Sequence, residues 1–169
     1  MMSEMPPRPA RLAAFVLLAS AIVPAAACRH DRDRTAGPTT TFAHPNGLTL
    51  VLPERVDGRG LSLKQTETGF DVRDAWSARY ETHVTVDLRP GAAPPLSAFP
   101  RTRTIGGRTI RYAERELEGP FGSGGPEYDL RAWEPARGGH IAYAEGVQTE
   151  GAPDFSLAWM VIAALAPPP

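Results

Sequence analysis

The sequence predicts an α+β domain: a predominantly antiparallel β-sheet built from hairpins, with one C-terminal helix packed on it. Three observations lead to this prediction. The 169 residues include 18 Pro and 16 Gly, too many for a helical bundle. Apolar and polar residues alternate along several short stretches, as they do in half-buried strands. Helical spacing of apolar residues is convincing only once, close to the C-terminus.

The first predicted hairpin spans residues 42–53, FAHPNGLTLVLP. An edge strand leads into the Asn46-Gly47 turn, because these two residue types tolerate the positive φ that a tight turn needs. Pro53 ends the second strand, since it has no N–H to donate. Residues 61–63 and 69–72 continue the pattern as further strands.

Residues 80–88 alternate most regularly of all. One face of this strand carries Tyr80, Thr82, Val84, Val86 and Leu88, and the other carries Glu81, His83, Thr85 and Asp87. The next segment, residues 90–100, holds four prolines and is predicted to be a loop with a short helical turn near 96–99.

Two more hairpins follow. Residues 102–105 and 108–112 flank the Gly106-Gly107 turn, and residues 128–133 and 140–144 flank a predicted turn at 135–139. A glycine-rich excursion at 119–126 separates the two hairpins.

The predicted helix runs from Pro153 to about Leu165. Pro153 suits the first helical turn, and Asp154 complements the helix dipole there. The face expected to pack on the sheet consists of Phe155, Ala158, Trp159, Ile162 and Leu165.

Residues 1–27 have the organisation of a secretory signal peptide. Arg8 and Arg11 precede an apolar run at 12–23, and Pro24 and Ala25-Ala26-Ala27 follow it. The apolar run is too short to serve as a permanent membrane anchor, which takes about 20 residues.

The only cysteine, Cys28, stands directly after this small-residue run, in an arrangement that resembles the lipobox of bacterial lipoproteins. The resemblance implies that Cys28 is lipidated, whereas ordinary cleavage after Ala27 would leave a free thiol. Arg29, in place of Asp, implies sorting to the outer membrane. We therefore expect a periplasmic protein anchored by lipid in the inner leaflet of the outer membrane, with a disordered tether at 28–41, one domain at 42–166 and a proline tail at 167–169.

Searches for catalytic or metal-binding motifs give nothing. One cysteine excludes a disulfide framework and a cysteine-rich zinc site, and the four histidines show no ligand spacing, so we expect them to be exposed and without a metal. No nucleophile elbow, S-x-x-K motif or P-loop occurs. The net charge of -1 gives no electrostatic case for nucleic acid. We predict no catalytic residue, no resident metal and no cofactor.

Charge is unevenly distributed along the chain. Residues 55–113 are predominantly basic, whereas residues 114–154 are predominantly acidic. Either the two segments neutralise one another in space, or an acidic surface around the glycine-rich excursion docks on a basic partner. For the second case the candidate contact residues are Phe121, Ser123, Glu127, Tyr128 and Asp129.

Several segments together resemble a known group of proteins: HPNGLTLVLP at 44–53, GFDVR at 69–73, YDLRAW at 128–133 and the helix beginning PDF at 153. They resemble small periplasmic lipoproteins that act as immunity proteins against type VI secretion effectors, especially the muramidase-neutralising type. The opening segment and closing helix are also similar to the Mog1/PsbP-like fold.

The resemblance implies a non-enzymatic inhibitor that plugs the active-site cleft of a secreted peptidoglycan hydrolase, in some relatives with calcium at the interface. Two alternatives stay open from the sequence: a structural or assembly lipoprotein of the envelope, and an enzyme whose site is assembled from scattered Glu, His and Arg residues.

Overall fold

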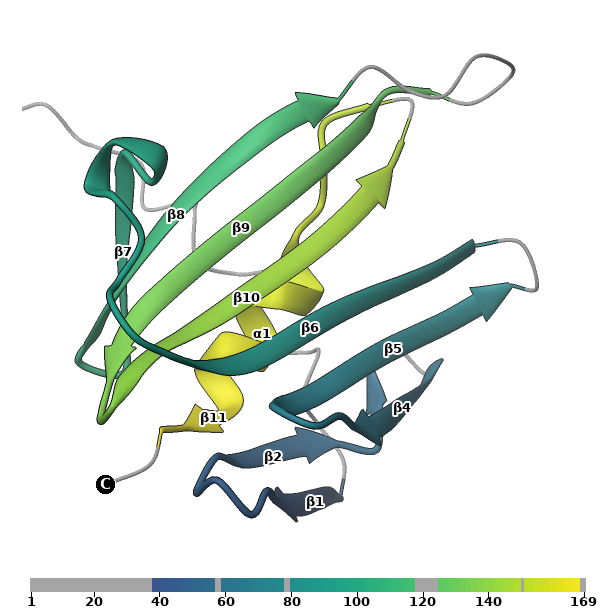
Figure 1. Ribbon diagram of the computed structural model, residues 1–169. Helices are drawn as coiled ribbons and strands as arrows, with labels where there is room; N and C mark the ends of the chain where they lie inside the picture. The colour runs from purple at the N-terminus through teal and green to yellow at the C-terminus, as the bar shows by residue number, and fades with distance from the viewer. Residues whose placement is uncertain (1–37, 57–58, 78–79, 118–124, 150, 168–169) are drawn as a thin grey trace, which may run out of the picture. The chain divides into compact units, whose positions relative to one another are not determined.

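A computed structural model describes residues 38–56, 59–77, 80–117, 125–149 and 151–167. In these residues the main feature is an eight-stranded antiparallel sheet with the order β3-β4-β5-β6-β10-β9-β8-β7 (Figure 1). Its strands are β3 (Arg55–Val56), β4 (Arg59–Gln65), β5 (Gly69–Ser77), β6 (Tyr80–Pro90), β7 (Arg101–Ile105), β8 (Arg108–Leu117), β9 (Glu127–Ala136) and β10 (Gly139–Gln148).

A smaller sheet of three strands has the order β1-β2-β11, with β1 at Thr39–Ala43, β2 at Thr49–Pro53 and β11 at Leu165–Ala166. β11 follows the helix α1 (Ser156–Ala164) directly and pairs with β2, so the two ends of the described chain meet in one sheet. The predicted antiparallel α+β class is therefore confirmed.

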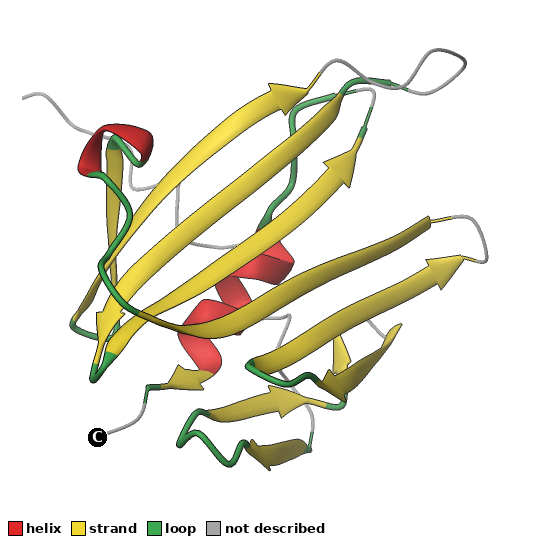
Figure 2. Cartoon of the chain, viewed as in Figure 1, coloured by secondary structure: helices red, strands yellow, loops and turns green. Residues whose placement is uncertain are grey.

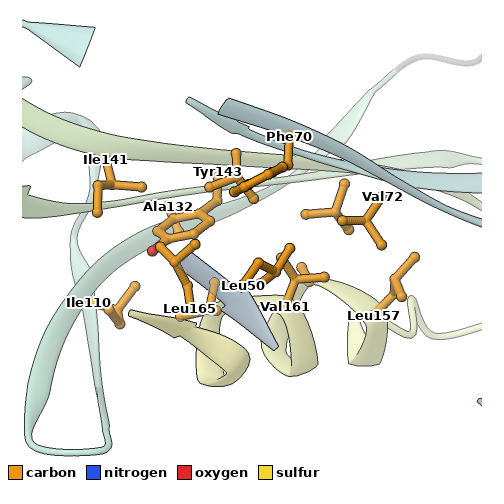
Figure 3. Close-up of a cluster of buried hydrophobic side chains, with 14 of the residues drawn as sticks. Leu50, Phe70, Val72, Ile110, Ala132, Ile141, Tyr143, Leu157, Val161 and Leu165 are labelled. Carbon is orange, nitrogen blue, oxygen red and sulfur yellow. The ribbon is translucent and has the colours of Figure 1, made fainter. Parts of the chain in front are cut away.

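The helix α1 lies against one face of the large sheet and contacts β2, β6 and β10 (Figure 2). Figure 3 shows the core that forms there, where Phe70 and Tyr143 from the sheet face Val161 from the helix. The burial of such side chains supplies the main driving force for folding, at about 25 cal/mol per Å² of apolar area removed from water.

The long connection between β6 and β7 contains the short 3₁₀ helix η1 (Leu96–Ala98), in agreement with the predicted turn. β10, β9 and β8 lie between β6 and β7 in the sheet, so this connection passes the ends of three strands before β7 begins (Figure 1). Phe99, at the end of the connection, packs edge-on against Trp133 of β9 with 6.4 Å between the ring centroids.

Two of the predicted hairpins have turns that differ from the prediction. The first has a five-residue loop instead of a two-residue Asn-Gly turn, because Ala43 pairs with Thr49. In the last hairpin the turn consists of Arg137 and Gly138 alone, since Gly138 adopts φ 80° and reverses the chain in two residues. The hairpin at Gly106-Gly107 is confirmed, and both glycines have positive φ.

The C-terminal helix is confirmed, but its predicted bounds are wrong at both ends. Asp154 Oδ1 accepts a hydrogen bond from the Ser156 N–H (3.0 Å), and this local turn keeps residues 153–155 out of the helix. At the other end Leu165 leaves the helix to pair with Leu50 of β2. No helix among the described residues is long and apolar enough to cross a membrane.

Candidate interaction surface

The large sheet has one face packed on α1 and an opposite face that α1 does not cover, which we call the open face (Figure 2). Side chains alternate between the two faces along each strand. On β9, the buried Leu130 and Ala132 point to the helix side, so Asp129, Arg131 and Trp133 belong to the open face.

The middle of the open face is formed by the central strand β10, which carries only small residues there. Ala142, Ala144 and Gly146 follow one another at every second position. The neighbouring strands β6 and β9 place Asp87 and Arg131, respectively, on the same side. Charged side chains therefore flank a low strip of backbone and methyl groups.

Ion pairs between an aspartate and an arginine repeat across this face. Asp71 pairs with Arg73 on β5 (2.7 Å), and Asp87 pairs with Arg89 on β6 (3.2 Å). On the other side of β10, a single carboxylate oxygen of Asp129 accepts hydrogen bonds from two arginines. These contacts are Arg115 Nη2 at 2.5 Å and Arg131 Nε at 2.9 Å.

The two members of each pair differ in how far they reach into solvent. The Asp129 side chain is 10 % exposed, whereas those of Arg115 and Arg131 are 50 % and 58 % exposed. Aspartate is short and stays against the sheet, while arginine is long and carries its guanidinium outward. The carboxylates thus orient the arginines, and in each of these pairs the more exposed group is the positively charged one.

One end of the open face is aromatic. Trp133 is packed between Phe99 and His140, and the His140 ring lies edge-on to Trp133 at 6.2 Å between centroids. Both Trp133 and His140 are buried. The end of the β6–β7 connection therefore covers this part of the face and fixes its side chains.

A polar cluster lies on the opposite, helix-packed side and was not anticipated from the sequence. Glu134 accepts hydrogen bonds from Arg108 and from the Tyr143 hydroxyl (2.5 Å), and Arg108 also donates to the Ile162 carbonyl of α1. Burial, and then the neighbouring Glu134, raise the pKa of the Tyr143 hydroxyl, so it stays protonated and donates. This cluster ties β8, β9 and β10 to the helix.

Glu145 is another buried acid on the helix side. Its side chain is almost fully enclosed, and its Oε2 accepts a hydrogen bond from the Ala158 N–H in the first turn of α1 (2.8 Å). No side chain of the helix itself caps that end, so Glu145 of β10 supplies the acceptor for a backbone N–H of the first helical turn. Burial raises the pKa of the Glu145 carboxyl to about 8, against a smaller opposing effect of the Ala158 hydrogen bond.

The expectation of exposed histidines is wrong for two of them. His44 and His140 are each 7 % exposed. His44 lies within 3.1 Å of the Thr66 carbonyl through Nε2 and accepts a hydrogen bond from the Asn46 N–H, so it holds the first hairpin loop together. His83 is exposed, as predicted. Among the described residues no group of three or more His, Cys, Asp or Glu side chains is placed to hold a metal ion.

The predicted contact residues divide into three groups. Glu127 and Asp129 lie on the open face, and Tyr128 points to the other side, where it packs against the core. Phe121 and Ser123, like the predicted lipidation site Cys28, lie outside the described residues. The structure brings Asp129 together with two arginines that the sequence did not single out, Arg115 and Arg131.

The charge asymmetry along the chain is partly cancelled in space. Arg101 pairs with Glu114 (2.5 Å) and Arg108 pairs with Glu134, in each case joining the basic segment to the acidic one. Of the two interpretations left open by the sequence, these contacts favour mutual neutralisation over a continuous acidic surface.

Comparisons with known proteins identify the family. Residues 49–166, well over half of the chain, match the type six secretion immunity 3 domain. No curated protein matches the chain. Similar solved structures include a crystal structure from Bacteroides thetaiotaomicron, which is 14% identical over 75% of this chain and 47% of that chain, with a TM-score of 0.47. This chain thus spans about half the length of that protein.

The matched segment begins at the first residue of β2 and ends with β11, so it includes the open face, the core and the helix described above. The chain belongs to the type six secretion immunity 3 domain family.

Proposed function

We propose that this protein is a type VI secretion immunity protein, lipidated at Cys28 and held in the periplasm at the inner leaflet of the outer membrane, which blocks the active-site cleft of a cell-wall-degrading effector. One observation carries the proposal: a secretory signal and a lipobox-like cysteine precede a domain that matches an effector-immunity family. An inhibitor has to reside in the compartment where its target acts. A secreted inhibitor therefore indicates a target of the envelope, and peptidoglycan is the polymer that a periplasmic toxin can cleave there.

Inhibition by binding, without turnover, is supported by where the acidic groups lie. The most enclosed carboxylates, Glu134 and Glu145, are on the helix-packed side, where a substrate has no access. The aspartates of the open face are held in ion pairs with arginines. A general acid or base needs to reach the substrate directly, so these groups favour a role in binding.

A lipid anchor would strengthen inhibition beyond what the affinity for the effector provides. A protein tied to the membrane by a short segment is confined to a thin layer beside the cell wall, which raises its effective concentration for a hydrolase that arrives there. The proposed anchor would therefore keep the inhibitor where the proposed effector acts.

Co-expression in the periplasm tests the proposal. The product of the neighbouring gene, directed to the periplasm, should lyse cells when expressed alone and leave them intact when this protein is co-expressed. The purified neighbour should also clear a suspension of peptidoglycan, and this protein should stop the clearing at an equimolar ratio. Equal killing with and without this protein would refute the immunity function against that partner.

The nature of the target has a separate readout. If this protein protects cells but the neighbour leaves purified peptidoglycan intact, the immunity role stands and the cell-wall target is wrong. Calcium at the interface is a further part of the proposal, and the binding assay repeated with EDTA checks it: affinity should fall when the ion is removed.

A further inference from the structure

The arginine-bearing part of the open face has the features of a docking surface. Arg115 and Arg131 project on one side of the small-residue strand β10, and Arg73 projects on the other. Their side chains are between 41 % and 58 % exposed, so the guanidinium groups reach solvent. The low strip between them leaves room for a protein segment to approach the sheet closely.

Preorganisation distinguishes these arginines from ordinary surface arginines. The Asp129 carboxylate, which is close to the sheet and shielded from water, holds Arg115 and Arg131 together. A free arginine loses side-chain entropy when a partner immobilises it, whereas one already oriented by a buried carboxylate loses less. Each guanidinium has five N–H donors in a fixed plane, and the contact with Asp129 uses only some of them.

We propose that the open face receives an acidic segment of the effector, whose carboxylates pair with Arg115 and Arg131. This inference rests on the proposed function, because it assigns the surface through which the inhibition works. Arginine is the residue best suited to bind carboxylates with two parallel hydrogen bonds. The proposal reverses the expectation from the sequence, in which an acidic surface of this chain met a basic partner.

The chain also offers a control arginine that lies away from the open face. Arg101 has the same side-chain exposure as Arg131, 58 %, and also forms an ion pair with an acid, Glu114. It differs in position, because Arg101 pairs with Tyr112 of β8, whose ring packs on Trp159 of the helix. Loss of either arginine removes one exposed positive charge, but only Arg131 stands on the open face.

The test measures binding of the purified neighbouring-gene product to three forms of the full chain. Arg115→Gln/Arg131→Gln should weaken binding by about tenfold or more, mainly through slower association, and should reduce its salt dependence. Arg101→Gln should stay within about twofold of the wild-type affinity, as expected for a charge outside the contact. Glutamine keeps one hydrogen bond to Asp129 available, and equal melting temperatures of the three forms exclude a folding defect.

Competition identifies the charge of the occupant. Poly-L-glutamate should displace the effector, and it should bind the wild-type chain more tightly than the double variant. Equal binding of the effector by the double variant, equal losses in the double variant and in Arg101→Gln, or equal binding of poly-L-glutamate by the wild type and the double variant would each overturn the assignment of this surface while leaving the immunity function intact. Displacement by anionic phospholipid vesicles alone would assign the surface to a membrane instead. No binding by the wild-type chain would refute the proposed partner, and with it this surface.

Discussion

At the residue scale, two buried carboxyl groups hold the sheet against the helix. Glu134 and Glu145 are apart from any partner surface, yet each fixes a contact between the sheet and α1. Glu134 reaches the helix through Arg108, while Glu145 binds the helix backbone directly. Because both lie in the protein interior, the free energy of unfolding depends on their charge state and on their partners.

Glu145 predicts a pH dependence of stability. The pKa of its carboxyl is about 8 in the folded chain and 4.5 ordinarily, so between these values the folded state holds a proton that the unfolded state releases. The contribution of this group to the free energy of unfolding is therefore fully present below about pH 4.5 and is lost as the pH rises through 8. The total loss is roughly 3 to 5 kcal/mol.

Glu145→Gln tests this, because glutamine keeps the acceptor for Ala158 without a charge. Urea unfolding at a series of pH values should give a flatter stability curve for the variant than for the wild type between pH 5 and 8. A parallel curve in the two proteins would show that another group is responsible.

The second prediction at this scale concerns Arg108. Arg108→Met leaves the buried Glu134 without its cation and should cost about 3 kcal/mol. Adding Glu134→Gln removes the uncompensated charge and should recover part of that loss. Arg101→Met, which breaks an exposed ion pair, should cost less than about 1 kcal/mol. Guanidinium unfolding measures all three, and similar losses from Arg108→Met and Arg101→Met would contradict the assigned role.

At the scale of elements, the sheet depends on two places where strands approach closely. A Cβ atom added at Gly69 would lie 1.9 Å from the Val86 carbonyl oxygen, and one added at Gly139 would lie 2.0 Å from the Arg89 carbonyl oxygen. Both carbonyls belong to β6, so glycines from β5 and from β10 flank the same end of that strand.

Gly139→Ala should therefore destabilise the chain by about 2 kcal/mol or more, because backbone has to move to admit the methyl group. Gly60→Ala is the control, since a Cβ there meets nothing within 4 Å and the position has no positive φ. Thermal melting compares the two variants, and a neutral Gly139→Ala would show that the end of β6 adapts freely.

The same scale shows which elements were predictable. Strands β6 to β10 follow from alternation and from the glycine turns, because side-chain periodicity is a local property. The sequence did not predict that Leu165 lies outside the helix, since its spacing from the other apolar residues fits a helix. Only its pairing with Leu50 places Leu165 in a strand. The residue type of Pro135 predicts a turn, although Pro135 lies in β9 opposite His140.

At the scale of the whole molecule, the proposed function combines a cellular location with a binding surface. The proposed signal peptide and lipidated Cys28 would set the location, and the proposed surface lies in the segment that matches the immunity domain. We expect Cys28→Ala to move the protein from the membrane fraction to the soluble periplasmic fraction, because the acyl chains would be lost. Protection against the effector should weaken with the local concentration.

Arg29→Asp provides the matched control, since it keeps the cysteine and changes only the sorting residue. This variant should stay in the membrane fraction and shift to the inner membrane, as density-gradient separation would show. A Cys28→Ala protein that still sediments with membranes would contradict lipidation.

Local sequence patterns predicted the fold class, the positions of most strands along the chain and a secretory signal, because hydrophobic periodicity, turn glycines and signal-like composition are properties of neighbouring residues. Which charges meet depended instead on how the strands pair in the folded chain. Asp129 and Arg115 are adjacent because β8 and β9 pair. The short aspartate stays close to the sheet while the arginine is exposed, although both residues belong to a segment that is acidic along the chain. Charge at a surface depends on side-chain length and on register across the sheet, and neither can be read along one strand.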